Sequence, residues 1–138
     1  MGAWSHEPFG NDTACDWAYD LENTHDLSLI EQAFDEVLDL GTDDYLDSYE
    51  GSHAVAAAEV LAKLLGKGTQ TDGYTSKIDA WVQSIHIQPS ETLLKKAQQA
   101  LTRIMTENSE LQELWGETDD YNEWVNSINT LQAALSST

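Results

Sequence analysis

Rows of carboxylates spaced one helical turn apart are the residues most able to do chemistry in this sequence. Asp stands at every fourth position from 12 to 20, and Glu or Asp does so from 31 to 39. In a helix this spacing sets like charges side by side, and each such pair costs about 0.2–0.5 kcal/mol. A Lys at one of these positions would remove that cost, and none is present. We therefore expect two acidic helix faces that attract cations or basic proteins.

A third acidic stretch, from Gly41 to Gly51, also contains two tyrosines and is predicted to be a loop. Calcium needs six or more oxygen ligands in a fixed loop, and the spacing here does not match the helix-loop-helix calcium pattern, so no metal site is predicted. The predicted partner-binding residues are Asp12, Asp16, Asp20, Glu31, Asp35, Asp39, Asp43, Asp44 and Asp47. A purely solubilising role for these carboxylates is the alternative interpretation.

The charge of the chain is concentrated in its first half. Residues 1–62 contain 15 Asp or Glu and no Lys or Arg, whereas residues 63–138 contain 10 acids and all six bases. The net charge of −19 repels nucleic acids and anionic membranes, so we expect neither as a partner. No apolar run is long enough to cross a bilayer, no secretory signal is visible, and Cys15 is the single cysteine. These features predict a cytoplasmic protein.

Catalytic motifs are missing from the sequence. His6, His25, His53 and His86 are scattered, and no His-Glu-x-x-His, Cys-x-x-Cys, Gly-x-Ser-x-Gly or phosphate-binding loop occurs. Cys15 lies beside a predicted core face and is interpreted as a small buried hydrophobe. We therefore expect no catalytic residue, no bound metal, no cofactor and no enzymatic activity.

Helical periodicity dominates the chain, and strand alternation is nearly absent. It predicts an all-α fold, a compact single-domain bundle of six or seven short helices spanning 1–138. Asn11 or Asp12 is expected to cap the first helix, Ser90 the fifth, and capping boxes at 28–31 and 109–112 to open the second and sixth. Residues 1–10 are predicted to be an irregular packed leader and 66–75 a flexible internal loop. Trp115 and Trp124 are interpreted as core residues.

Three stretches carry a recognisable pattern of aromatic and acidic residues. They are Met1-Gly-Ala-Trp4 with Phe9 and Asn11-Asp-x-Ala14-x-Asp-Trp17; Tyr45-Leu46 with Ala54 to Ala62 and Leu65-Gly66; and Asn108-Ser-Glu-Leu-x-Glu-Leu-Trp115 with Trp124 and Leu131. In this pattern the chain resembles the bacterial family known as domain of unknown function 4259, although Ser5 replaces the family's usual Gly. The resemblance implies a small helical cytosolic protein and brings no established activity, cofactor or catalytic residue.

Taken together, these features favour a non-enzymatic acidic binding protein, with an immunity or inhibitor protein that neutralises a basic bacterial toxin or nuclease as the leading hypothesis. Acidic surfaces speed the capture of basic proteins. One alternative is a metal-dependent enzyme or metal sensor built from His6, His25, His53 and nearby carboxylates. A second is an acidic mimic of nucleic acid.

Overall fold

The regular structure of this protein is helical. The computed structural model describes residues 5–41 and 43–136, and apart from one isolated parallel bridge between Leu46 and Ser109 all regular structure in these ranges is helix. The helices are α1 (Asp12–Leu21), α2 (Ser28–Leu38), α3 (Ser48–Leu64), α4 (Ser76–Ile85), α5 (Glu91–Ile104), α6 (Glu110–Gly116) and α7 (Tyr121–Leu135). The prediction of an all-α fold is confirmed. None of these helices is long and apolar enough to cross a membrane.

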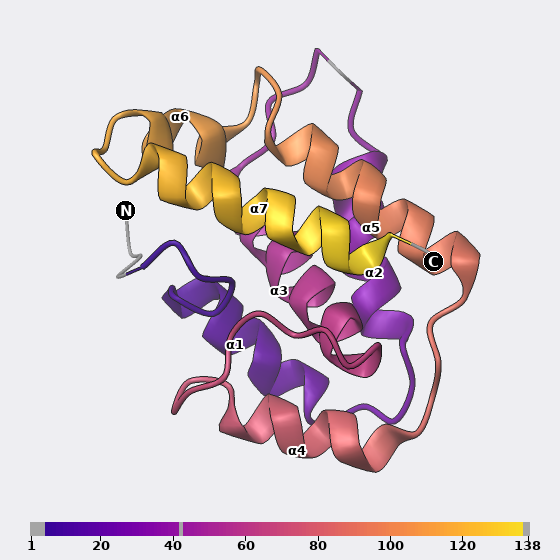
Figure 1. The fold of residues 1–138 in the computed structure, drawn as a ribbon. Coiled ribbons are helices and arrows are strands. Elements are labelled where there is room, and N and C mark those ends of the chain that lie inside the picture. The colour runs from indigo at the N-terminus through magenta and orange to yellow at the C-terminus, as the bar shows by residue number, and fades with distance from the viewer. Residues whose placement is uncertain (1–4, 42, 137–138) are drawn as a thin grey trace.

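Helix α3 occupies the centre of the molecule, and α1, α2, α5 and α7 all pack against it (Figure 1). Its alanine-rich middle explains this position, because small side chains allow neighbouring helices to approach closely. Every residue from Ala54 to Ala62 is buried. Gly51 allows the closest approach, since a Cβ at this position would lie 2.9 Å from Cδ1 of Leu111.

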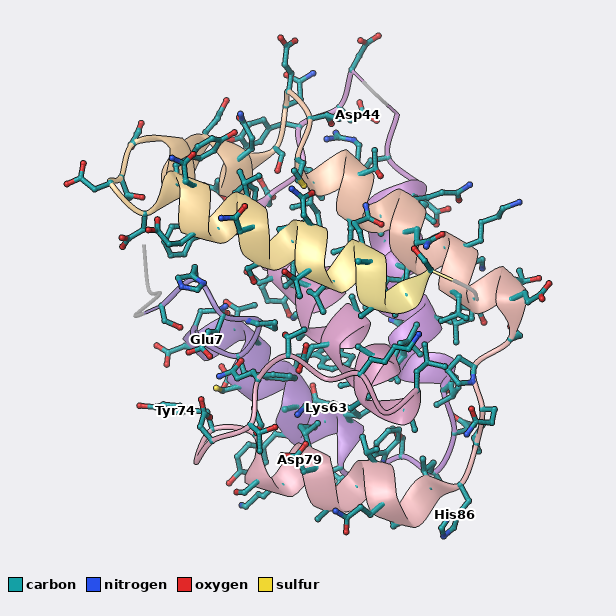
Figure 2. The ribbon with its side chains drawn as sticks, viewed as in Figure 1. Glu7, Asp44, Lys63, Tyr74, Asp79 and His86 are labelled. Atoms are coloured by element: carbon teal, nitrogen blue, oxygen red, sulfur yellow. The ribbon has the colours of Figure 1, made fainter. Side chains whose placement is uncertain are left out.

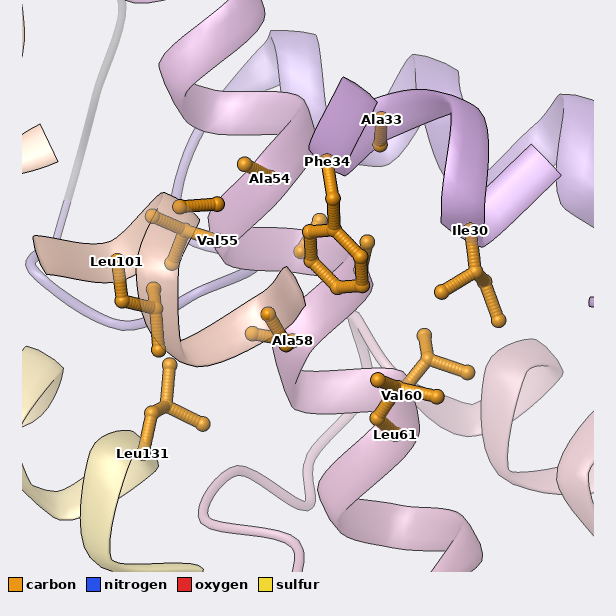
Figure 3. Packing of buried hydrophobic residues seen from close by; sticks show 14 of the residues in the cluster. Ile30, Ala33, Phe34, Ala54, Val55, Ala58, Val60, Leu61, Leu101 and Leu131 are labelled. Atoms are coloured by element: carbon orange, nitrogen blue, oxygen red, sulfur yellow. The ribbon is translucent and has the colours of Figure 1, made fainter. Parts of the chain in front are cut away.

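One hydrophobic cluster contains side chains from all seven helices. Phe34 of α2 is fully buried and points toward α3, with Ile30 nearby (Figure 3). Leu101 of α5 and Leu131 of α7 close the cluster from the other side of α3, and both are completely buried. The apolar stripes that the periodicity predicts therefore face one shared core.

Local hydrogen bonds fix several helix ends as the sequence predicts. Asn11 Oδ1 accepts a hydrogen bond from the Ala14 amide at 2.8 Å, and Ser90 Oγ accepts one from the Leu93 amide at 3.1 Å. Ser109 Oγ caps α6 by accepting from the Gln112 amide. All three are N-caps that satisfy otherwise unpaired amides of the first turn.

Two predicted helix starts are wrong. Ser28 lies inside α2 instead of capping it, because Leu27 takes the N-cap position and Ser28 donates through both N and Oγ to Asp26 Oδ1. Helix α3 begins at Ser48, so the predicted loop ends before Gly51. The Ser48 amide donates to Glu110 Oε1 at 2.7 Å, and this long-range bond holds the first turn of α3 in place.

A buried carboxylate lies in the middle of α3. Glu59 is completely inaccessible to solvent and accepts three hydrogen bonds from the segment after the helix. The amides of Thr69 and Gln70 both donate to Oε2 at 2.8 Å, and Thr69 Oγ1 donates to Oε1 at 2.6 Å. A buried charge is tolerated only when it is paired and hydrogen-bonded, so these donors are required for Glu59 to be buried.

Lys63 completes this arrangement. Its Nζ lies 3.7 Å from Glu59 Oε2 and 2.7 Å from Asp79 Oδ1, and it also donates to the Gln70 carbonyl. Figure 2 shows Lys63 and Asp79 close together between α3 and α4. We call Glu59, Lys63, Thr69, Gln70 and Asp79 the Glu59 network. It holds the segment 66–75, predicted to be flexible, at Thr69 and Gln70.

The Glu59 network also reaches the amino-terminal segment. Gln70 is buried, and its Oε1 accepts a hydrogen bond from the Phe9 amide at 2.8 Å. Phe9 itself is fully buried. The packed leader predicted for residues 1–10 is thus observed from Pro8 to Gly10, which are all buried, whereas Trp4 lies outside the described residues.

We expect Glu59→Gln to lower the free energy of unfolding by about 3 kcal/mol or more, because it leaves Lys63 with a weakened partner and places an amide N–H against backbone donors. Urea denaturation at neutral pH measures this change. Glu117→Gln, a change of the same type at an exposed position, should stay within about 0.5 kcal/mol. Equal stability of the two variants would contradict the importance of the network.

Candidate partner-binding surface

The carboxylates of α1 form an exposed row. Asp12, Asp16 and Asp20 are all exposed, as their spacing predicts. Asp12 lies in the first turn, where a negative charge interacts favourably with the helix dipole. No Lys or Arg forms an ion pair with any of the three within the described part of the chain. This row is open to a partner.

The carboxylates of α2 already have a cation beside them. Lys96 of α5 donates to Glu31 Oε2 at 2.8 Å and to Asp35 Oδ1 at 3.0 Å. These hydrogen bonds raise the pKa of Lys96, first through Glu31 and then through Asp35. Asp39, at the C-cap of α2, is exposed. Glu31 and Asp35 are therefore less available to a basic partner than the spacing on α2 alone predicts.

The acidic segment between α2 and α3 is anchored to the α5–α6 connection. The amide of Leu46 donates to the Asn108 carbonyl at 2.7 Å, and the amide of Glu110 donates to the Leu46 carbonyl at 2.8 Å. Arg103 donates from Nη2 to the Asp44 carbonyl. On the side of the acidic segment these bonds use backbone atoms, and Asp43, Asp44 and Asp47 remain exposed. The Asp44 carboxylate accepts a local hydrogen bond from the Gly41 amide at 2.9 Å, and Figure 2 shows Asp44 at the outer end of the segment.

Tyr45 adds a side-chain contact to this anchor. Its hydroxyl donates to Glu113 Oε2 at 2.7 Å. This hydrogen bond, together with desolvation and the nearby Glu113, Glu110 and Asp47 charges, raises the pKa of Tyr45 to about 12. The phenol is therefore protonated at any physiological pH and serves as a hydrogen-bond donor.

The structure does not gather the nine predicted residues into one surface. Figure 1 shows α3 between α1 and α2, so the two helical rows lie on different sides of the central helix. The segment 43–47 projects from a third place, beside α5 and α6. A single partner of ordinary size would contact one of these groups directly. It would interact with the other groups mainly through long-range electrostatic attraction.

A hollow of about 320 Å³ lies where α2, the acidic segment and α3 meet, and is lined by Glu36, Leu40, Tyr45, Asp47 and Glu50. One carboxylate oxygen of Glu36 and one of Glu50, Oε2 in each case, are covered from solvent and accept no hydrogen bond from any described residue. Covered polar atoms of this kind normally have a partner. The two oxygens thus have unused capacity to accept hydrogen bonds, which a donor in the hollow would reach when the Glu36 and Glu50 side chains rotate toward it.

Two aromatic rings on α3 lie next to Glu36, one of the residues that line the hollow, without lining it themselves. Nδ1 of His53 lies 3.7 Å from Glu36 Oε2, and its ring lies 4.3 Å from that of Tyr49, centroid to centroid. Tyr49 and Tyr45 are exposed by 59% and 47%, so both present aromatic surface to solvent. We call the residues around the hollow the acid–tyrosine patch; they are Glu36, Tyr45, Asp47, Tyr49, Glu50 and His53.

Of this patch, only Asp47 belongs to the binding residues that the sequence predicts. Glu50 lies in the acidic stretch 41–51, whereas Glu36 falls outside the row of carboxylates on α2. Glu36 and Glu50 are 14 residues apart in the sequence and line one hollow because α2 packs against α3. The interleaving of tyrosines with acids between 45 and 50 is the signal that points to this region.

The histidines and the cysteine do not gather into a metal-binding cluster within the part of the chain that the structure describes. No group of three or more His, Cys, Asp or Glu side chains in residues 5–41 and 43–136 is arranged to hold a metal ion. Cys15 is half-buried and its Sγ contacts the Phe9 carbonyl at 3.6 Å. Burial, followed by the charges of Asp12, Asp16 and Asp72, raises the pKa of the thiol, which keeps it protonated and weakly nucleophilic.

The fold and this surface define a class: a small, strongly acidic, all-α protein with an exposed patch of carboxylates and tyrosines. The chain belongs to the family described as Domain of unknown function (DUF4259), whose model matches residues 2–127. No curated protein matches the chain, and no solved structure does.

We expect Glu113→Gln to lower the pKa of Tyr45 from about 12 toward the ordinary value of about 10, because the charged acceptor of its hydroxyl is lost. A pH titration of the Tyr45 ring signals by NMR measures the pKa. Glu117→Gln, which removes the same charge at a position without a contact to Tyr45, should leave it unchanged. A pKa near 10 in the unmodified protein would show that the acidic segment is not anchored to α6.

Proposed function

We propose that this chain is a non-enzymatic binding protein whose acid–tyrosine patch captures a basic protein, and that it serves as an immunity or inhibitor protein against a basic bacterial toxin or nuclease. The observation that carries the proposal is a pair of covered carboxylate oxygens in one hollow, on Glu36 and Glu50, neither of which accepts a hydrogen bond from a described residue. An arginine guanidinium fits such a site because it donates several hydrogen bonds in a planar fork and carries a permanent positive charge.

The tyrosines support the same proposal. Tyr and Arg are enriched at the centres of protein interfaces, where a rigid aromatic ring buries much surface for little loss of conformational freedom. Tyr45 lines the hollow together with Asp47, and the exposed Tyr49 follows two residues later in the sequence. A basic side chain that enters the hollow would therefore meet the ring of Tyr45 as well as carboxylates.

The rest of the acidic surface would act at a distance. Of the 25 Asp and Glu residues, all of which lie in the described ranges, only Glu31, Asp35, Glu59 and Asp79 form ion pairs with Lys. The field of the remaining carboxylates attracts a basic partner and raises its association rate at low salt. In this proposal the α1 row steers the partner, and the acid–tyrosine patch holds it.

The proposal calls for the chain to bind through surface groups rather than through a reactive centre. The metal-site alternative gains no supporting feature in the described residues, because His6, His25 and His53 stand on separate elements. The proposed location is the cytoplasm, where a basic toxin or nuclease would act on its producer.

Surface plasmon resonance against the products of the genes next to the chain's own gene tests the proposal, and we expect a basic toxin or nuclease among them to bind. We expect Glu36→Gln/Glu50→Gln to raise the dissociation rate about tenfold or more, because two partners of a buried cation lose their charge. Raising the salt concentration should slow association in both the unmodified chain and the variant, since the steering carboxylates are unchanged.

The matched control is Glu91→Gln/Glu117→Gln, which removes the same charge at two exposed positions outside the patch. It should alter the association rate slightly and the dissociation rate not at all. Equal effects of the two double variants would mean that net charge alone drives binding.

Two further results distinguish between the possible roles. Competition by duplex DNA for the same basic protein would favour a nucleic-acid mimic. Failure to protect cells that express the basic protein would contradict an immunity role. Reversal of Glu31 or Asp35 is unsuitable, because it would place a new cation against Lys96.

A further inference from the structure

A second cavity, of about 90 Å³, lies between the amino-terminal segment, α3 and the α6–α7 pair. It is separate from the acid–tyrosine patch, since the two share no lining residue. One side of the cavity is aromatic and aliphatic, formed by Trp115 of α6, Trp124 of α7 and Val55 of α3. Trp115 and Trp124 are core residues, as the sequence predicts, with 6% and 3% of their surface exposed.

The other side of the cavity is polar. His6 lines it, and Nδ1 of that ring is covered from solvent without a hydrogen-bond partner among the described residues. Ser52, which is buried on α3, and the exposed Asp12 at the start of α1 line it as well. The aromatic wall, the unpartnered nitrogen and the carboxylate thus come from four different parts of the chain.

The charges around the cavity determine whether it favours a cationic, neutral or anionic ligand. Glu7 and Asp12 both line the cavity, and no Lys or Arg does so among the described residues. An anion would meet only repulsion, and a neutral apolar group would leave His6 Nδ1 without a partner. A small cation with methyl or methylene groups suits the indole rings and the carboxylates, because ammonium groups are attracted to both, and a primary ammonium can in addition donate a hydrogen bond to His6 Nδ1.

We propose that this cavity binds the alkylammonium group of a small organic amine or of a lysine side chain. Its volume suits such a group, since about 10–15 Å³ in the same measure already holds one water molecule. In the bound state the methyl or methylene carbons lie against Trp115 and Trp124, and the positive charge lies toward Asp12. This inference goes beyond the proposed function and does not depend on it.

Titration of the full chain with tetramethylammonium tests the site, with the indole N–H signals of Trp115 and Trp124 followed by NMR. We expect both signals to shift and to saturate in the millimolar range, as befits a ligand of few atoms. tert-Butyl alcohol, a neutral molecule of similar size, should bind at least about threefold more weakly. Equal binding of the two probes, or no saturable shift, would overturn the proposal; a cavity filled by the chain's own amino terminus would give the latter result.

Paired variants connect the signal to the cavity. Asp12→Asn should weaken tetramethylammonium binding about threefold or more, whereas Asp20→Asn, on the same helix but outside the cavity, should leave it unchanged. His6→Ala lies in an irregular segment and gives a second variant that does not alter a helix. Equal affinities of the Asp12 and Asp20 variants would show that the probe responds to net charge and would overturn the site.

Two further arms identify the source of the ligand and separate this inference from the proposed function. A shift of the same indole signals by n-butylammonium but not by a lysine-rich peptide would assign the site to a free amine, and a shift by both would assign it to a protein side chain as well. Glu36→Gln/Glu50→Gln should leave tetramethylammonium binding intact. If this double variant loses its basic partner and still binds tetramethylammonium, the result supports both proposals as separate sites. Either proposal can therefore fail without the other.

Discussion

The burial of Glu59 is the constraint on which much of this structure depends. A carboxylate in the middle of a buried helix is unfavourable unless donors replace the water that it loses. Thr69 and Gln70 supply three hydrogen bonds and Lys63 supplies a positive charge, so the chain after α3 must turn back along the helix. A polar, glycine-containing segment thereby becomes a structural element, and breaking the arrangement would leave an unpaired charge in the core.

The same network positions parts of the molecule that are far apart in sequence. Gln70 accepts from the Phe9 amide, which holds the amino-terminal segment beside α3 and places His6 at the cavity near Trp115 and Trp124. Lys63 reaches Asp79 and so joins α4 to the same centre. Helix α3 therefore links both candidate sites. Its first turns carry Tyr49, Glu50 and His53 of the acid–tyrosine patch, and Ser48, Ser52 and Val55 in the same stretch of α3 line the cavity.

The positions of the few basic residues determine how much of the negative surface charge is neutralised within the molecule. Lys63 is used inside the Glu59 network, Lys96 bridges two carboxylates of α2, and Arg103 donates to the Asp44 carbonyl of the acidic segment. Lys77 lies 5.1 Å from the centre of the Tyr19 ring. With these cations engaged in internal contacts, most carboxylates keep their full field toward solvent, and the molecule remains attractive to positive charge over much of its surface.

The sequence by itself determined the helices, their apolar stripes and the caps at Asn11 and Ser90, because each of these depends on residues within about one or two turns of each other. It also determined which stretches are acidic. Only the tertiary structure decided which acids are free: Lys96 pairs with Glu31 and Asp35 across more than 60 residues, Glu59 is hidden, and Glu36 meets Glu50 in one hollow. Such contacts have no periodic signature, since they depend on how helices dock rather than on how each one forms.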